Sequence, residues 1–256
     1  MLNLIHEEFY KLFHKTGTYV GVAIMFLVQI AIAAIAKKAP TFMAPESAMS
    51  SGFLGESIAL FIMIAAAASI IAMEFQYGTI RQLLYRKYYR SQVFISKLIV
   101  VVLHAVVLYV LAYAMSFVLK FVLFPKIDLS QQVGHGRTFV EAMTLSTVTG
   151  FVGTLLLLSI VVLLATMLKN NAVAITVGYI GYFVIELASS FLLILIDKWD
   201  WIKWNPFTML LFSNQAGTPA IHTMTHLSTM QLGLGSALYT VAFSFIAYAL
   251  FRRRNV

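Results

Sequence analysis

Two ionisable side chains lie inside long apolar stretches of the sequence and are the first candidates for chemistry. Glu186 follows Gly178 and Gly181 in one stretch, and His104 lies in another. At a rise of ~1.5 Å per residue, they are about 15 Å (His104) and 21 Å (Glu186) from the inner ends of their stretches, so contact is conceivable. An ionisable group inside a membrane marks a substrate path by default. We therefore take Glu186 and His104 as candidate residues of a translocation path; a purely structural hydrogen bond, or a neutral Glu186, remains the alternative.

Other chemistry-bearing patterns are incomplete. The chain has no cysteine, which excludes thiolate nucleophiles and Cys-ligated metals. His222 and His226 have the i, i+4 spacing of metal ligands on a helix, but residue 223 is Thr rather than the Glu of a zinc protease, and no nearby carboxylate or Cys completes a site. We expect no catalytic residue, no metal site and no cofactor bound by this chain, and hence no enzyme.

The composition indicates which solvent surrounds these residues. Of 256 residues, 61% are hydrophobic and 11% charged, whereas a soluble domain has about a quarter charged residues. So few charges leave too little polar surface to face water, and a bilayer removes that problem. The net charge of +8 then indicates basic loops against anionic headgroups rather than nucleic acid.

Hydropathy predicts an all-α, polytopic integral membrane protein with six transmembrane helices. A span needs about 20 apolar residues. The runs that meet this length are 17–36, 55–73, 94–124, 143–168, 172–196 and 232–251. We expect a single transmembrane domain over 1–256. Residues 1–16 precede the first span and carry Leu2, Ile5, Phe9, Leu12 and Phe13 at helical spacing, which predicts an amphipathic helix in the membrane interface.

Basic residues set the expected orientation. With the N-terminus in the cytoplasm, 11 of the 18 Lys and Arg residues and all arginines except Arg137 lie inside. The positive-inside rule therefore places both termini in the cytoplasm. The same choice puts Trp199, Trp201 and Trp204 at the outer interface. Lys97 and Lys120, near span ends, are expected to extend their ammonium groups to the membrane surface.

The loop over 74–92, between the second and third spans, has more structure than a generic basic loop. Gly78 tolerates the left-handed conformation that ends a helix. Thr79 and Gln82 have the spacing of a capping box that begins a new one. Ile80, Leu83 and Leu84 would form its apolar face, next to Arg81 and Arg86. The loop therefore predicts a short basic amphipathic helix between two spans.

This loop resembles a known family. The pattern Glu74-Phe75-x-x-Gly78-Thr79-Ile80-Arg81-x-Leu83-Leu84, followed by basic residues and by Lys97-Leu98, resembles permease subunits of type-2 ABC exporters (the ABC-2 class). The likeness is to small bacterial permeases of bacteriocin-immunity, bacitracin-resistance and peptide-export systems. The resemblance implies that this region is a cytoplasmic coupling helix that docks on an ATPase. The coupling residues would be Glu74, Gly78, Thr79, Ile80, Arg81, Leu83, Leu84 and Arg86. It also implies a partly embedded outer segment before the last span, here 197–231 with Trp204-Asn205-Pro206-Phe207.

The resemblance implies partners as well. No G-x-x-x-x-G-K-[ST] phosphate-binding loop occurs in the chain, so ATP and Mg would be bound by separate cytoplasmic ABC ATPase subunits. Six spans would form half of a pore, completed by a second permease copy or a related chain. The location expected is the bacterial cytoplasmic (plasma) membrane, in contact with membrane lipid, and the cargo an amphipathic peptide, antibiotic or lipid-linked molecule.

Two other classes remain open. A secondary transporter would show repeated halves, broken helices and several midplane charges. A membrane-embedded enzyme would need clustered catalytic groups at one depth. Glu186 and His104 alone support neither strongly.

Overall fold

The computed structural model describes residues 2–78, 88–132 and 136–254, and in these ranges the chain is built of helices without a strand. Six of the helices are long and apolar enough to cross a membrane. They are α2 (Thr16–Lys38), α4 (Gly55–Gln76), α6 (Arg90–Leu123), α7 (Phe139–Met167), α8 (Asn171–Ile196) and α12 (Thr229–Arg253). Each covers one of the six apolar runs, so the expectation of an all-α chain with six candidate spans is confirmed.

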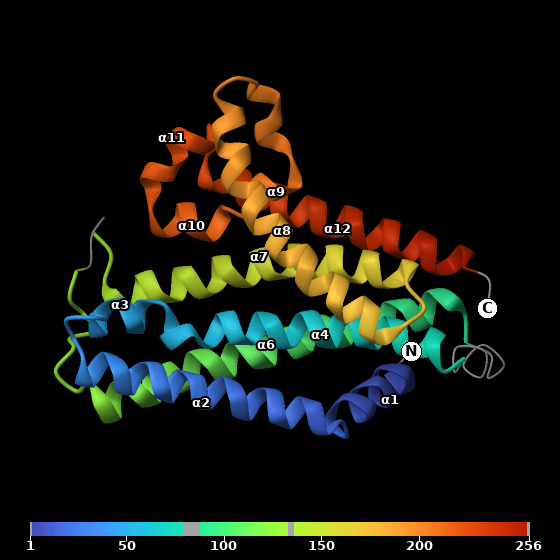
Figure 1. The fold of residues 1–256 in the computed structure, drawn as a ribbon, viewed down its shortest axis with the longest axis horizontal. Coiled ribbons are helices and arrows are strands. Elements are labelled where there is room, and N and C mark those ends of the chain that lie inside the picture. The colour runs from blue at the N-terminus through green and yellow to red at the C-terminus, as the bar shows by residue number, and fades with distance from the viewer. Residues whose placement is uncertain (1, 79–87, 133–135, 255–256) are drawn as a thin grey trace.

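Shorter helices fill the segments between and before the long ones. They are α1 (Leu2–Phe13), α3 (Pro45–Ser50), η1 (Gly52–Leu54), η2 (Asp200–Trp204), α9 (Pro206–Met209), α10 (Phe212–Gly217), η3 (Pro219–Ile221) and α11 (His222–Thr225). Five of them, from η2 to α11, gather at one side of the bundle, between α8 and α12 in the chain (Figure 1). Both termini lie at the opposite end, which we call the terminal end (Figure 1).

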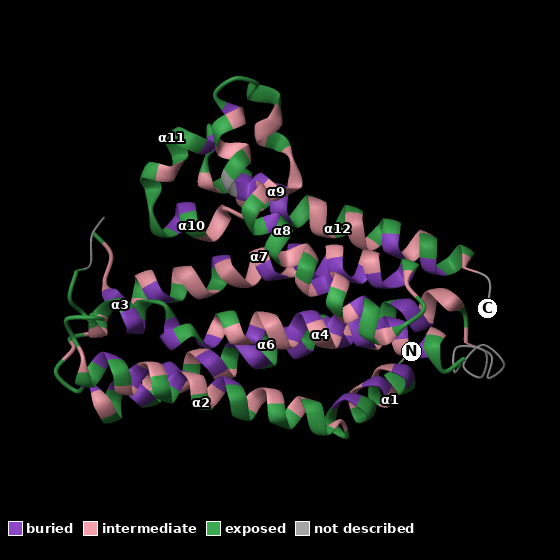
Figure 2. Cartoon of the chain, in the orientation of Figure 1, coloured by how far each residue is buried: buried purple, intermediate pink, exposed green. Residues whose placement is uncertain are grey.

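Helix α4 is the centre of the bundle, because it packs against α2, α6, α7 and α8. Its inner faces carry small residues: Ala59, Ala67, Ala68 and Ala72 are fully buried. Small residues let helix backbones approach closely where no water drives association. Helices α2, α8 and α12, by contrast, expose most of their surface (Figure 2). Most of those exposed side chains are apolar, as a lipid-facing surface requires; Glu186 on α8 is an exposed exception.

Gln29, the one strongly polar residue predicted for the first span, connects α2 to neighbouring segments by hydrogen bonds. Gln29 is fully buried, and its Nε2 donates to the Gly52 carbonyl at 3.1 Å and the Ala112 carbonyl at 2.9 Å. It thereby joins α2 to α6 and to the turn before α4. Phe53 and Leu54 in that turn have φ of 49° and 62°, a conformation that non-glycine residues rarely adopt. The buried Phe53 ring, stacked on Phe124, holds the turn in place.

Helix α1 forms at the predicted place but turns a different face to the bundle. Its buried residues are Leu4, Glu8 and Leu12, whereas Leu2 is 81% exposed and Phe13 46% exposed. Of the predicted apolar stripe, Leu12 is buried, Ile5 and Phe9 are half-buried, and Leu2 and Phe13 face outward. The inward face carries a carboxylate because, as described next, that carboxylate has partners on α6.

Candidate functional site

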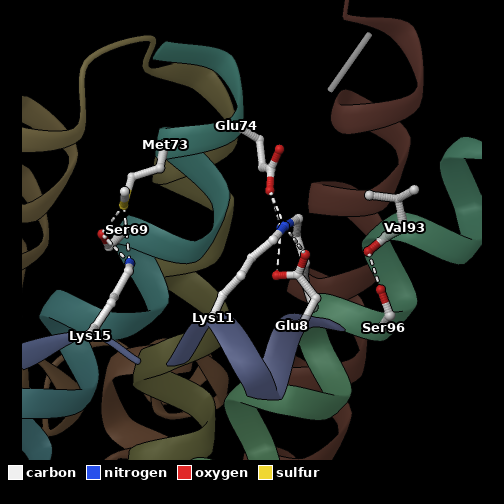
Figure 3. Close-up of polar contacts among 9 residues, drawn as sticks. Glu8, Lys11, Lys15, Ser69, Met73, Glu74, Val93 and Ser96 are labelled. Atoms are coloured by element: carbon white, nitrogen blue, oxygen red, sulfur yellow. Dashed lines mark hydrogen bonds and ion pairs between the residues drawn. The ribbon is translucent and has the colours of Figure 1, made fainter. Parts of the chain in front are cut away.

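Four charged side chains from three helices form an ion cluster at the terminal end of the bundle, with three of them buried and Lys11 at its edge 47% exposed. We call Glu8, Lys11, Glu74 and Lys97 the terminal ion cluster. Lys97 Nζ lies 2.8 Å from Glu8 Oε2 and 3.2 Å from Glu74 Oε1. Lys11 Nζ lies 2.8 Å from Glu8 Oε1 and 2.9 Å from Glu74 Oε1, so each lysine bridges both carboxylates (Figure 3). The cluster ties α1, the end of α4 and the start of α6 together.

Burial makes this cluster different from a surface ion pair. The Lys97 side chain is 1% exposed and that of Glu8 3%. The expectation that Lys97 reaches the membrane surface is therefore wrong: its stem points into the bundle, where two carboxylates satisfy the ammonium. Lys120 is likewise buried, with its ammonium over the Phe121 ring. Removing one member of a buried pair leaves an uncompensated charge, which typically costs about 3–5 kcal/mol.

The two lysines at the edge of the cluster have opposite pKa shifts. Burial lowers the pKa of Lys11, but its hydrogen bonds to Glu8 and Glu74 and their charges outweigh burial, so the pKa rises above the usual 10.5. Burial lowers the pKa of Lys15 below 10.5, and repulsion from Lys97 lowers it further. Lys15 Nζ reaches only Ser69 Oγ at 3.5 Å and Met73 Sδ at 3.1 Å among the described groups (Figure 3).

Three consecutive residues at the end of α4 contact three different parts of the protein. Glu74 bonds to the ion cluster as described. The Phe75 ring lies 3.7 Å from the Arg254 guanidinium, and Arg254 also donates to the Leu168 carbonyl at the end of α7. Gln76 Oε1 accepts a hydrogen bond of 2.8 Å from the Asn171 backbone N–H at the start of α8. We call Glu74-Phe75-Gln76 the α4 junction.

The backbone after the α4 junction has the conformation that the sequence predicts. Helix α4 ends at Gln76, and Gly78 has φ of 67° with open space around its α-carbon. The expected left-handed helix end at Gly78 is therefore confirmed. Thr79, Ile80, Arg81, Leu83, Leu84 and Arg86, and the capping box of Thr79 with Gln82, lie outside the described residues.

Glu186 lies in a cavity of about 230 Å³ toward the other end of the bundle, and it shares this cavity with a second carboxylate. That residue is Glu56, in the first turn of α4, which accepts a hydrogen bond from the Thr147 hydroxyl. Tyr109, bonded to Thr154 at 2.6 Å, also lines the cavity. Sequence reasoning missed Glu56 because an acidic residue at a helix start usually complements the helix dipole.

His104 lies elsewhere. It lines a larger cavity of about 500 Å³ between α2, α4 and α8, together with Lys15 and Ser69. It is 4% exposed, and its Nε2 has no hydrogen-bond partner in the part of the chain that the structure describes. The contact considered between His104 and Glu186 is thus not formed, since the two line different cavities.

The histidine pair between α8 and α12, His222 and His226, is also arranged differently from the expectation. His226 has a positive φ of 52° at the end of α11. Its ring nitrogens lie 3.4 Å from Asp197 Oδ1 and 3.4 Å from Asp200 Oδ1. The statement that no carboxylate lies near these histidines is therefore wrong, because α8 and η2 fold back against α11.

Comparisons with known proteins bear on the whole chain. A family model described as "Protein of unknown function (DUF2705)" matches residues 12–256. The chain belongs to this family. It is 23% identical to the "Uncharacterized protein YhcI" of Bacillus subtilis (strain 168), with 100% of this chain and 99% of the relative covered. It is 29% identical to the "Uncharacterized membrane protein YdbK" of the same organism, with 80% of each chain covered. The name of the second relative agrees with six apolar helices, and neither name states an activity.

Proposed function

We propose that this chain is the membrane-spanning permease subunit of an ATP-driven exporter of the ABC-2 class. The observation that carries the proposal is the α4 junction. The segment that resembles an ATPase-coupling helix begins at Thr79, three residues after Gln76, and the junction links its start to α1, α6, α8 and the C-terminus. A force applied at that segment would reach most of the bundle through contacts of one helix end.

The terminal ion cluster suits this role physically. Pulling the end of α4 away would take the Glu74 carboxylate from both Lys97 and Lys11, and breaking a buried ion pair typically costs about 3–5 kcal/mol. The end of α4, the start of α6 and α1 therefore resist separation and move together. In the proposed orientation this end faces the cytoplasm, α1 lies in the inner membrane interface, and residues 197–231 form a partly embedded outer segment.

The cavity with Glu56 and Glu186 is the candidate path for cargo in this proposal. It lies toward the outer side of the bundle and combines carboxylates with hydroxyl groups, which suits an amphipathic substrate with a cationic or hydrogen-bonding part. ATP and Mg belong to the separate ATPase subunits, and a second permease copy or related chain completes the pore.

A proton-coupled secondary transporter is the second candidate, and the shared cavity of Glu56 and Glu186 is what favours it. Two carboxylates facing one intramembrane cavity can carry a proton. The two candidates differ in their energy source: transport by the second would follow an imposed pH gradient without ATP or any partner chain.

Co-purification with an ABC ATPase tests the first candidate, and this ATPase would be sought among the genes next to that of this chain. Gly78→Pro is incompatible with φ of 67°, because proline fixes φ near −65°, and Arg81→Glu reverses a charge of the proposed coupling segment. Gly136→Pro is the matched control, since Gly136 has φ of 68° and open space at the opposite end of the bundle. The proposal expects the ATPase to remain with the wild type and Gly136→Pro and to be lost from the other two. Retention by all four chains would refute the coupling role of the segment.

A further inference from the structure

The 500 Å³ cavity that holds His104 has one polar end and one apolar end. Helices α2, α4 and α8 form most of its walls, and Glu8 and Leu12 of α1 also line it. Lys15, Ser69 and His104 supply the polar end. Gly21, Ile58 and Ile62 belong to the apolar remainder. The terminal ion cluster adjoins this cavity but already uses its own groups: Glu8, which also lines it, binds Lys11 with one oxygen and Lys97 with the other.

The polar groups lie at one depth. Ser69 is five residues before Glu74 on α4, and His104 is seven residues after Lys97 on α6. Since Glu74 and Lys97 are bonded to each other, Ser69 and His104 lie about 8 Å and 10 Å further into the bundle than that pair. The Lys15 ammonium reaches the level of Ser69, at 3.5 Å from its hydroxyl.

The polar end has an excess of positive charge and an unused hydrogen-bonding atom. Lys11, Lys15 and Lys97 face two carboxylates, Glu8 and Glu74, which leaves one positive charge over. That charge is located on Lys15, which has no carboxylate within 4 Å in residues 2–78, 88–132 and 136–254. His104, which lines the same cavity, has a buried Nε2 that meets no hydrogen-bonding group of the described residues. A buried polar atom of this kind costs free energy unless a ligand or water meets it.

The apolar end has the length and opening that a lipid chain requires. From Ser69 to Ile58 along α4 the wall extends about 16 Å. Val20 and Ile24, which also line the cavity, are 50% and 48% exposed on the outer surface of α2. The cavity therefore opens toward the surroundings of α2, where acyl chains lie if α2 spans a bilayer.

We propose that this cavity binds an anionic phospholipid, with the phosphate-bearing headgroup at Lys15, Ser69 and His104 and one acyl chain along α4 toward Ile58. Charge decides between this ligand and a zwitterionic lipid, since the excess cation has no internal partner. The site requires neither ATP nor an ATPase subunit, so this proposal can be tested independently of the exporter proposal.

Lipid binding by purified, delipidated protein tests this site. Native mass spectrometry would count phosphatidylglycerol bound against phosphatidylcholine with the same acyl chains. We expect preferential binding of phosphatidylglycerol, by about fivefold for one basic side chain at a membrane surface. Lys15→Gln should abolish the preference. Lys38→Gln, at an exposed position at the other end of α2, should retain it.

A second variant separates the site from folding defects. Ala66→Phe places a ring in the cavity without altering any charged residue, and we expect it to lower the occupancy of both lipids while gel filtration and melting remain as in the wild type. Equal binding of the two lipids by the wild type would overturn the proposal. So would an unchanged preference in Lys15→Gln, or a dimer that carries no phosphatidylglycerol because a second copy covers the cavity.

Discussion

The ammonium of Lys97 lies 2.8 Å from the carboxylate of Glu8, a residue 89 positions earlier in the chain, and both side chains are almost fully buried. This contact joins α1, which precedes the first candidate span, to the start of α6, the third candidate span. Glu74, at the end of α4, contacts the same ammonium. Because the segment that resembles a coupling helix follows directly, the stability and the proposed function of the protein depend on the same few charges.

Replacing Lys97 by Met should destabilise the protein by about 3–5 kcal/mol, because Glu8 and Glu74 would both lose the buried ammonium that they share. Lys38→Met removes an exposed cation at the other end of the bundle and should change stability by less than about 0.5 kcal/mol. Equilibrium unfolding in mixed detergent micelles measures both. Equal stability of the two variants would mean that the cluster is not a determinant of stability.

The raised pKa of Lys11 predicts a specific pH dependence. A base whose folded-state pKa exceeds the unfolded value of 10.5 contributes stability that is fully present below 10.5 and is lost as pH rises through the folded-state pKa. The difference in unfolding midpoint between the wild type and Lys11→Gln should therefore be constant around neutral pH and shrink well above pH 10.5. A difference that grows with rising alkalinity would contradict the assigned pairing.

Two glycines one turn apart on α8 should respond differently to alanine. A β-carbon at Gly178 would lie 2.9 Å from Ile64 Cγ2, whereas one at Gly181 would lie 3.8 Å from Leu164 Cδ1. Gly178→Ala should cost about 1–3 kcal/mol by overpacking against α4, and Gly181→Ala should be neutral or slightly stabilising. Thermal unfolding of both variants in one detergent checks this. The opposite order would show that α8 packs on α4 in another register.

Glu56→Gln and Glu186→Gln should each reduce transport while the amount of folded protein in the membrane stays unchanged, because both carboxylates line one cavity. Glu141→Gln is the control, since Glu141 closes a capping box at the start of α7 and glutamine serves equally there. Protection of cells against an exported antimicrobial peptide provides the readout. Full protection by Glu186→Gln would remove Glu186 from the path.

The sequence predicted what depends on hydropathy and on local backbone preference. The apolar runs predicted the six long helices, and Gly78 predicted the end of α4, because both signals are contained in neighbouring residues. Lys97 was mispredicted and Glu56 overlooked because their surroundings are set by residues far away in the chain: Glu8 for the first and the cavity of Glu186 for the second. The inward face of α1 was missed for the same reason, since Glu8 is buried only through its partner on α6.

ATP hydrolysis in reconstituted membranes tests the central claim most directly. This chain would be combined with an ABC ATPase that co-purifies with it or is encoded next to it, and hydrolysis by the wild type compared with Glu74→Gln and Glu141→Gln. The account predicts that the wild type and Glu141→Gln bind the ATPase and change its rate of hydrolysis, and that Glu74→Gln binds it with a weaker change in rate. A wild-type chain that neither binds the ATPase nor alters its rate would contradict the account.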